Sequence, residues 1–424
     1  MKRYSKMAPI VAENITFNKF PQHRALHYHT ILSVAPFPYM PDPWNENNNH
    51  LLQFIQNEFN AAHPGIYLIL RPMNTLEDFY NLTLLEDFLT GNDSGYDVVE
   101  IDTVILGDLV AAGIITPQTY PILPDQIPSD WHPAAGAAVQ INQAVYAFPH
   151  LMCAYFLFTH GNPADKREFL SLEELERYLN NSYYVYNIPN LTYGSHRLVG
   201  NLNSSWDISA IWIDSQRDIF HSTFYTEAEA LHGYEHLSFE PMRKLAKLCE
   251  SDEGVNDCVD GKFEENYDEP AKLFGTYAAR AMFGYSERLF HILKESSSNN
   301  VADVKIQPLP LGTGAKRPVF FTDAYVFRRN LPANKLAAAQ AFVKFMATPR
   351  MQAAVVGNEA FSEQMPLRYL LPISKSAYNE PLLVSNRFYQ DYFRNLYGYA
   401  YPNTGLLSAR RQLAPAIRKY IKEQ

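Results

Sequence analysis

The sequence lacks several features that would place it in a common class. Its 424 residues include only 3 cysteines and 4 tryptophans, and 45 acidic residues outnumber 36 basic ones, so the net charge is −9. Proteins that bind nucleic acid carry a basic stripe, which this composition does not provide. No apolar run reaches the roughly 18–20 residues that a membrane-spanning helix needs. We therefore expect neither a nucleic-acid partner nor a membrane partner.

Phosphate loops and metal sites are missing as well. The segment LGTGAK, residues 311–316, lacks both the glycine spacing and the following Ser or Thr of a P-loop, and no Rossmann-type glycine pattern occurs. His27 and His29 would share one face of a strand, but no third ligand follows at a suitable spacing. We expect no metal and no organic cofactor.

The compartment depends on two features that the sequence leaves open. The N-terminal segment MKRYSKMAPIVAENITF is basic but has no apolar stretch of the roughly 7–15 residues found in a signal peptide. The protein would be secreted or periplasmic if a signal peptide has been removed from this numbering, and cytoplasmic otherwise. Cys249 and Cys258 flank an acidic turn and could form a disulfide, which would favour export, or could remain thiols.

The residues that are present favour a large folded protein with stacking surfaces. Hydrophobic residues make up 47% of the chain and charged residues 19%, so a substantial core is available. The length favours two or three domains or lobes. The 28 tyrosines and 26 phenylalanines can pack a core, and they can also line a site that stacks flat rings.

Strands and helices are expected to alternate through the first third of the chain. Apolar patterns predict strands over 26–42, 66–73 and 95–102, and helices over 47–65, 75–91 and 103–113. This order is typical of a parallel sheet covered by helices on both faces.

The later elements follow a less regular order. A strand over 145–158, interrupted at Pro149, precedes helical segments and a strand over 318–330. We expect helices over 171–181, 204–220, 240–250, 268–282 and 334–357, the last broken at Pro349.

These parts predict two α/β lobes with a ligand cleft between them. Lobe 1 would contain residues 22–145 and 308–385, and lobe 2 residues 146–307. Residues 386–424 would form a C-terminal helical segment that packs on the lobes. In such folds ligands bind in the crevice at the carboxyl ends of the strands.

Several motifs carry a resemblance to a known family. PLPLGTGAKRPVFFTDAYVFRRN followed by AAAQAFVKFMATPRMQAAV resembles the hinge strand and closing helix of type II periplasmic solute-binding proteins. VYAFPHLMC, GYSERL and FTDAYVF, together with APFPYMPD, YDVVEIDTV and MPLRYLLPISKSAY, resemble thiaminase I over about residues 25–380. The cysteine combined with Tyr-x-Glu is the specific part, and the remainder is shared with plain binding proteins.

The resemblance implies a defined activity. Thiaminase I has the solute-binding fold and cleaves thiamine by replacing its thiazole with another nucleophile at the pyrimidine methylene. The implied partners are thiamine and a cosubstrate such as pyridine, aniline, a thiol or another amine, and the protein would act as a monomer.

The resemblance also assigns roles to residues. Cys153 matches the nucleophile and Glu287 the base, while Asp102 and Asp323 match the acidic residues, expected at strand ends, that hold the aminopyrimidine. Aromatic side chains line the cleft of the family, and the matching positions are Tyr39, Tyr267, Tyr285, Phe37 and Phe321. The last two stand where the family has tyrosine, so they keep the stacking surface but lose two hydroxyl groups.

The residue types suit this chemistry. A thiolate can add to the electron-poor pyrimidine ring, which lets the methylene carbon expel the thiazole; a second nucleophile then adds and the cysteine departs. Only the thiolate attacks, so a carboxylate within hydrogen-bond reach would take the proton and later return it. Apolar surroundings would raise the pKa of Glu287 toward the working range.

Each residue also has an ordinary structural explanation. Free cysteines are mostly packing residues, as are most tyrosines in apolar segments. Asp102 could cap the helix that follows it, Glu287 could stabilise a helix start, and Asp323 could face a loop. His150 precedes Cys153 by three residues, but on a strand the two side chains would point to opposite faces, which disfavours a Cys-His hydrolase.

Two other functions remain possible from the residues. One is a solute-binding protein that carries thiamine or a related pyrimidine without chemistry, in which Cys153 is inert. The other is an enzyme of the same fold that acts on a thiamine-like analogue, which the two phenylalanines keep open.

Overall fold

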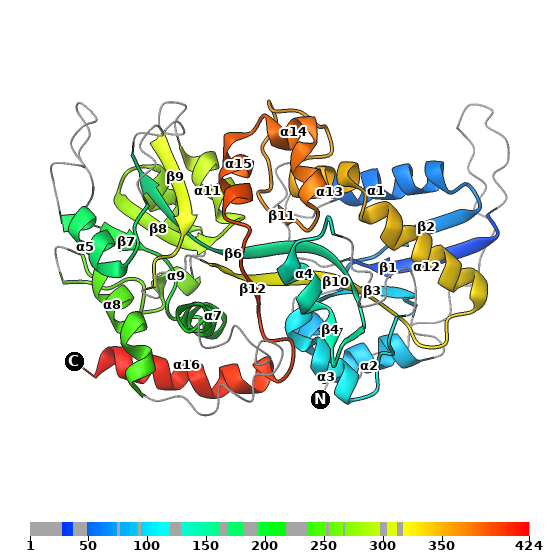
Figure 1. The fold of residues 1–424 in the computed structure, drawn as a ribbon, viewed down its shortest axis with the longest axis horizontal. Coiled ribbons are helices and arrows are strands. Elements are labelled where there is room, and N and C mark those ends of the chain that lie inside the picture. The colour runs from blue at the N-terminus through cyan, green and yellow to red at the C-terminus, as the bar shows by residue number, and fades with distance from the viewer. Residues whose placement is uncertain are drawn as a thin grey trace.

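The structure is a computed structural model in which two lobes lie side by side (Figure 1). It describes residues 28–36, 49–73, 77–91, 95–118, 129–161, 168–180, 194, 196–217, 236–251, 254–265, 268–296, 303–311 and 317–423. The long strands β6 (Phe148–His160) and β10 (Val319–Phe327) run across the middle and connect the two lobes.

One lobe begins with the parallel strands expected from the sequence. β1 (Thr30–Ala35) pairs in parallel with β2 (Ile66–Leu70) and with β3 (Val98–Asp102). Helices α1 (Asn49–Ala62) and α12 (Ala333–Met346) pack against these strands. The predicted alternation of strand and helix is confirmed here.

The sheet is mixed rather than wholly parallel, which corrects the sequence-based expectation. Its strand order is β2-β1-β3-β10-β6-β8-β7, and β10 runs antiparallel to both β3 and β6. β8 (Ala279–Tyr285) and β9 (Val304–Pro308) pair antiparallel with β6, and β7 (His196–Val199) is parallel to β8. The pattern of the first three strands carries no information about the direction in which a later segment returns to the sheet.

The remaining elements cover the sheet and connect its strands. Shorter strands are β4 (Gln140–Ile141), β5 (Ala144–Val145), β11 (Leu371–Pro372) and β12 (Tyr399–Ala400). The other helices are α2 (Leu82–Thr90), α3 (Leu106–Ala111), α4 (Pro133–Ala138), α5 (Leu172–Asn180), α7 (Ser205–Ser215), α8 (Glu240–Leu248), α9 (Lys262–Glu265), α10 (Glu269–Gly275), α11 (Arg288–Glu295), α13 (Pro349–Val356), α14 (Pro381–Val384), α15 (Arg387–Arg394) and α16 (Leu406–Lys422). Single 3-10 turns are η1 (Glu77–Tyr80), η2 (Thr103–Ile105), η6 (His236–Phe239) and η8 (Lys375–Asn379).

Strand β6 is not interrupted at Pro149, contrary to the expectation. The pairing with β10 slips by one residue there, because Asp323 lies opposite Leu151 whereas Ala324 lies opposite Pro149. The unmatched residue, His150, forms a β-bulge. A bulge accommodates proline, which has no N–H to donate to the ladder, and the strand continues through it.

Two predicted helices have different limits. The helix predicted over 268–282 ends at Gly275, and the alanine-rich segment after it forms β8. Tyr277 adopts a left-handed φ of 62°, which breaks the helix and redirects the chain into the sheet. The helix predicted over 75–91 is divided at Asn81, whose side chain caps α2 by accepting a bond of 3.2 Å from the Leu84 N–H.

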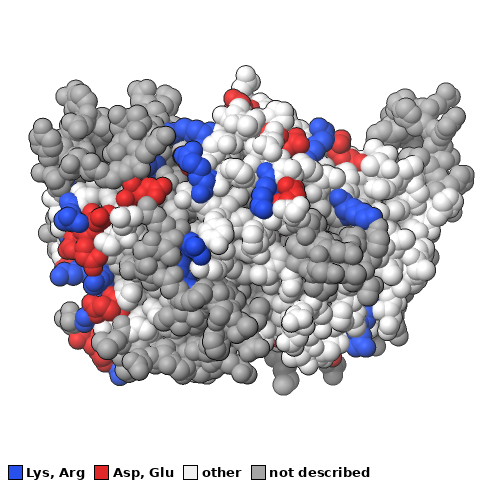
Figure 2. Space-filling model, viewed as in Figure 1, with Lys and Arg blue, Asp and Glu red and all other residues white. Residues whose placement is uncertain are grey.

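Charge and hydropathy agree with the composition. None of the described helices is both long enough and apolar enough to cross a membrane. On the face drawn in Figure 2, acidic and basic side chains are intermixed at the end that carries α5 and α8, and the described residues form no basic stripe there.

Cys249 and Cys258 form a disulfide, which settles the pairing that the sequence left open. Both side chains are buried, and the bridge ties the end of α8 to the backbone near Leu202, whose N–H donates to the Cys258 carbonyl oxygen at 2.8 Å. Cys153 is the free cysteine.

We expect that replacing Cys249 and Cys258 together by alanine lowers the free energy of unfolding by about 2–3 kcal/mol, because the bridge restricts a short loop of the unfolded chain. Urea unfolding followed by circular dichroism measures this. Cys153→Ser is the matched control, because it removes a thiol without touching the bridge. An unchanged unfolding midpoint in the double variant would contradict the expectation.

Candidate active site

The register of three strands brings the predicted residues onto one sheet face. Cys153 lies opposite Phe321 in the β6–β10 pair, and Asp323 lies opposite Asp102 in the β10–β3 pair. Phe321 and Asp323 are two residues apart on β10, so their side chains point to the same face. A thiol, an aromatic ring and two carboxyl groups therefore form a row across three strands.

Strand β8 extends this row on the other side of Cys153. Tyr155, two residues after Cys153 and thus on the same face, lies opposite Tyr285, and their ring centroids are 4.2 Å apart. The Tyr285 ring also meets Phe321 edge to face at 5.7 Å. Glu287 follows β8 by two residues and occupies the first position before α11. Five predicted residues thus lie on neighbouring strands or directly after one of them: Cys153, Phe321, Asp323, Tyr285 and Glu287. The sixth described one, Asp102, is opposite Asp323.

Cys153 differs from every other residue of β6, because the rest of this strand is buried and Cys153 is partly exposed. Burial of the thiol raises its pKa well above the ordinary value, and the negative charges of Glu287, Asp323 and Asp102 raise it further. Each of these effects disfavours the thiolate. A reaction at Cys153 therefore needs a neighbouring base to remove the proton.

Glu287 has the properties of such a base. Its side chain is buried and makes no capping hydrogen bond, but Glu287 is the residue directly before α11, so its place at a helix start agrees with the structural explanation considered from the sequence. Burial raises the pKa of Glu287 to about 7, while hydrogen bonds, including one of 3.2 Å from the Ser286 hydroxyl, act in the opposite direction. A carboxyl group with this pKa can take a proton and return it near neutral pH.

Asp102 and Asp323 are paired across β3 and β10, with Asp102 buried and Asp323 partly exposed. Asp102 accepts hydrogen bonds from the Val104 N–H at 3.1 Å and from the Tyr80 hydroxyl at 3.0 Å, and burial raises its pKa to about 6. The pKa of Asp323 is raised well above the ordinary value, first by burial and then by the charge of Asp102. The negative charge of Asp102 thus disfavours ionisation of Asp323.

The positions of the two aspartates differ from each other. Asp102 ends β3 and caps η2, which confirms the capping role considered from the sequence. The same residue also belongs to the row, so the two roles are compatible. Asp323 lies in the middle of β10, which corrects the expectation of a strand end and also excludes a loop-facing position. The antiparallel register of β10 and β3 places this mid-strand residue opposite Asp102.

Sequence reasoning did not identify Tyr155 or Asp207. The Tyr155 hydroxyl donates to Asp207, a buried residue in the first turn of α7. Asp207 also accepts a bond of 3.3 Å from the Asn201 side-chain amide. The signal that was available is the Ser204 cap three residues before Asp207, but the capping pattern does not show what the aspartate faces.

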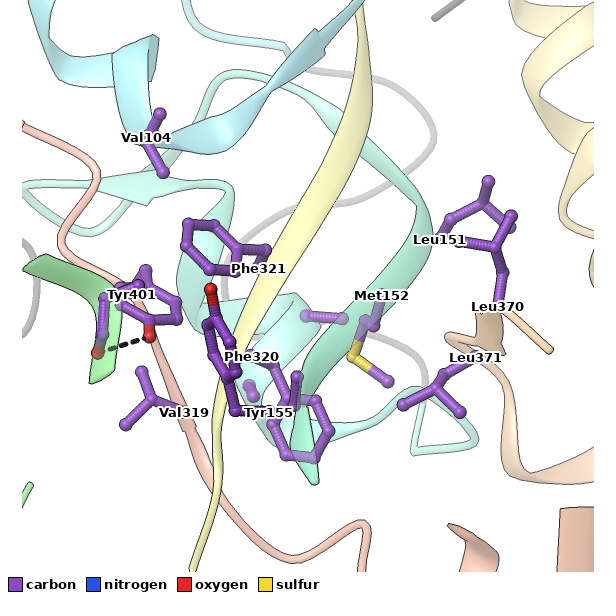
Figure 3. Close-up of a cluster of buried hydrophobic side chains, with 14 of the residues drawn as sticks. Val104, Leu151, Met152, Tyr155, Val319, Phe320, Phe321, Leu370, Leu371 and Tyr401 are labelled. Atoms are coloured by element: carbon purple, nitrogen blue, oxygen red, sulfur yellow. Dashed lines mark hydrogen bonds between the residues drawn. The ribbon is translucent and has the colours of Figure 1, made fainter. Parts of the chain in front are cut away.

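The segment after β12 adds a second aromatic surface. The ring of Tyr401 stacks on Phe321, with centroids 3.8 Å apart and planes inclined by 19°. The Tyr401 hydroxyl donates to the Ala210 carbonyl oxygen at 2.7 Å, the bond drawn as a dashed line in Figure 3. A residue near the C-terminus thus bonds to α7 and supports Phe321 in the row.

A third group lies beside Tyr80. The ring of Trp206, from α7, is 4.8 Å from the Tyr80 ring, and the Arg410 guanidinium lies 3.6 Å from the centroid of the Trp206 ring. Since Tyr80 bonds to Asp102, this group adjoins the carboxyl end of the row. None of the three residues was predicted.

The other sequence-based candidates fall into two groups. Phe37, Tyr39 and Tyr267 lie outside the described residues. His150 is buried, with its Nδ1 atom 2.5 Å from Glu100 and 3.0 Å from the Tyr325 hydroxyl, so its contacts are with these residues. Among the residues that the structure describes, no group of three or more His, Cys, Asp or Glu side chains could hold a metal ion.

Comparison with known proteins gives structural matches only. No protein-family model matches the chain, and no curated protein does. Thiaminase I from Bacillus thiaminolyticus matches with a TM-score of 0.69 and 17% identity over 92% of this chain and 99% of that one. Clostridium botulinum thiaminase I in complex with thiamin matches with a TM-score of 0.70 and 17% identity over 92% and 100%.

The fold is also that of binding proteins. The sugar-binding protein MalE from Xanthomonas citri matches with a TM-score of 0.66 and 13% identity over 93% of this chain and 92% of that one. At these identities the likeness concerns the fold alone. The chain therefore has the two-lobe α/β fold that thiaminase I shares with periplasmic solute-binding proteins, as expected from the sequence.

Proposed function

We propose that the protein is a thiaminase I-like transferase, which cleaves thiamine by replacing its thiazole with another nucleophile at the pyrimidine methylene. The observation that carries the proposal is the position of Cys153, the partly exposed residue of β6, in a row with the carboxyl groups of Asp102 and Asp323 and near Glu287, whose pKa burial raises to about 7. The resemblance of the sequence motifs and the likeness of fold to thiaminase I support it.

The proposed reaction has two steps. Glu287 takes the thiol proton, and the Cys153 thiolate adds to C6 of the pyrimidine while the C–N bond to the thiazolium breaks, so the thiazole leaves with the electron pair of that bond as a neutral ring. A pyridine, aniline, thiol or other amine then attacks the methylene carbon. The C–S bond breaks, the thiolate departs from the ring and Glu287 returns the proton.

The two aspartates suit an aminopyrimidine. This ring presents an N–H donor on its amino group next to an acceptor ring nitrogen. A carboxylate accepts from the first and a protonated carboxyl group donates to the second, and two carboxyl groups on paired residues can divide these roles. In this proposal Asp102 and Asp323 position the ring over Cys153.

The aromatic residues supply a surface for a flat substrate. Tyr285, Phe321 and Tyr401 lie in contact with one another on the Cys153 side of the sheet. Rings of this kind stack on heteroaromatic ligands and exclude water. Phe321 lacks the hydroxyl of the family's tyrosine, and in our proposal it acts through stacking alone.

A second candidate function is a solute-binding protein for thiamine or a related pyrimidine. The observation that favours it is electrostatic, because the neighbours that shift the pKa of Cys153 are all carboxylates and all disfavour the thiolate. The shared fold of MalE also suits it. This alternative requires tight binding of the unreacted ligand and no turnover.

The disulfide bears on the compartment. Structural disulfides persist in oxidising environments, so the Cys249–Cys258 bridge supports a secreted or periplasmic location. We propose that the protein acts there as a monomer, like binding proteins of this fold.

Substitution of Cys153 tests the proposed nucleophile. We expect Cys153→Ser to reduce the cleavage of thiamine in excess aniline by at least about a thousandfold, because a hydroxyl group is a far weaker nucleophile than a thiol near pH 7. Loss of thiamine absorbance and mass spectrometry of the products measure the rate. Met152→Leu is the control, because Met152 is buried on the opposite face of the same strand. Equal rates in wild type and Cys153→Ser would reject the proposed nucleophile, and tight thiamine binding without turnover in wild type would establish the carrier instead.

The proposed base makes the cleavage rate depend on pH. Glu287 must be deprotonated to accept the thiol proton, so kcat/KM should fall as the pH drops through about 7, the pKa to which burial raises this carboxyl group. We expect Glu287→Gln to lower kcat by about 10²–10⁴-fold and to abolish this acid limb. A pH profile of both proteins measures it. An acid limb that persists unchanged in Glu287→Gln would show that another group is the base.

A further inference from the structure

The C-terminal helix α16 contacts both sides of the candidate site. It packs against α7 and α8 at one end of its course and against η2, which follows Asp102, at the other. In Figure 1 it runs along the lower edge of the molecule from below α8 toward the centre. Residues on its inward face are therefore able to reach the site, and Arg410 is one of them.

Arg410 has a charge that the described protein does not neutralise. Its guanidinium lies on Trp206, and its buried Nε–H finds no hydrogen-bond acceptor. Among the described residues, no acidic side chain forms an ion pair with Arg410. A half-buried guanidinium with an unmet donor is unfavourable unless a ligand supplies an acceptor.

The position of Arg410 ties it to the candidate site. Its charge acts on Tyr80, the donor to Asp102, and it also interacts with Tyr285, the neighbour of Cys153 in the row. The Trp206 ring contacts both the Arg410 guanidinium and the Tyr80 ring. The guanidinium therefore lies at the edge of the site, on the side of Tyr80.

A hollow of about 450 Å³ adjoins Tyr80 on this side. It is lined by Tyr80, Asn81, Leu82, Asp108, Gly405, Leu407, Ser408 and Arg411. The acidic residue in it, Asp108, already accepts a bond of 3.1 Å from the Gly405 N–H. Ser408 and Arg411 add a hydroxyl group and a guanidinium, so this hollow, one residue along α16 from Arg410, offers donors to an oxyanion.

We infer that the site receives a substrate with an anionic group, a phosphate ester on the hydroxyethyl arm of the thiazole, which Arg410 binds at the edge of the site. This rests on the proposed function. Thiamine itself is a cation, so the charge of Arg410 opposes its binding, whereas a phosphate on the leaving group reverses the sign of this interaction. Guanidinium and phosphate form strong charge-assisted hydrogen bonds.

The test compares paired substrates on the full chain. We expect wild type to cleave thiamine monophosphate, with aniline as the nucleophile, with a kcat/KM at least about tenfold above that for thiamine. Arg410→Gln should bring this ratio close to one, and Arg410→Lys should keep part of it because the charge remains. Lys419→Gln is the matched control, since it removes the same charge from an exposed position on the same helix and should leave the ratio unchanged.

Other outcomes overturn the inference. A ratio near one in wild type, or a ratio that Arg410→Gln leaves unchanged, would assign Arg410 to packing on Trp206 alone. A preference for 4-aminobenzoate over aniline, without a preference for the phosphate ester, would place the anion on the incoming nucleophile and reject the thiazole side.

Failure of the proposed function is separable from failure of this inference. If wild type cleaves neither substrate, the transferase is rejected, but calorimetric titration still compares the binding of thiamine monophosphate with that of thiamine. Tighter binding of the ester that is lost in Arg410→Gln would support the anion site in a carrier. Equal binding of both compounds would overturn it.

Discussion

The register of β10 between β3 and β6 is the constraint on which the candidate site depends. It sets Asp323 against Asp102 and Phe321 against Cys153, so that groups from three distant parts of the chain face the same way. A shift by one residue would turn each of these side chains to the other face of the sheet. The bulge at His150 lies directly after Asp323 in the pairing, and the bonds of His150 to Glu100 and Tyr325 hold it in place.

This register brings several acidic side chains together in surroundings with little access to water, which disfavour the charged form of a carboxyl group. The pKa values of Asp102, Asp323, Glu287 and Asp207 are all raised, in each case first by burial. Such an arrangement contributes little to the stability of the fold, because each carboxyl group would be solvated better in water. Groups of this kind cluster at functional sites, where protons have to be shared or moved. The electrostatics of the row are therefore better explained by chemistry or ligand binding than by packing.

The sequence was sufficient for some parts of this arrangement and insufficient for others. Local motifs made Cys153 and Glu287 candidates, because a thiol in an apolar strand and the Tyr-x-Glu pattern each lie within a short segment, and their roles stay predictions. The position of Asp323 in mid-strand was missed, since a polar residue within an apolar segment also fits a strand end. The first residues of β8 fall in a segment for which the sequence predicts a helix, and the left-handed turn at Tyr277 that separates α10 from β8 has no clear signal. Tyr155, Tyr401 and Asp207 acquire their roles only through contacts over long sequence distances, which a single sequence does not reveal.

The C-terminal segment changes what the two-lobe fold can do. β12 pairs with β10 next to Phe320, so the residues that follow it are fixed to the strand that carries Phe321 and Asp323. Tyr401 then stacks on Phe321 and bonds to α7, and α16 carries on between η2 and α8. The segment from β12 to α16 therefore contacts the central strand β10, α7 and η2. Its side chains are consequently held in position at the edge of the site in advance of any ligand, and a group such as Arg410 can select a substrate by charge without the cost of ordering a mobile segment.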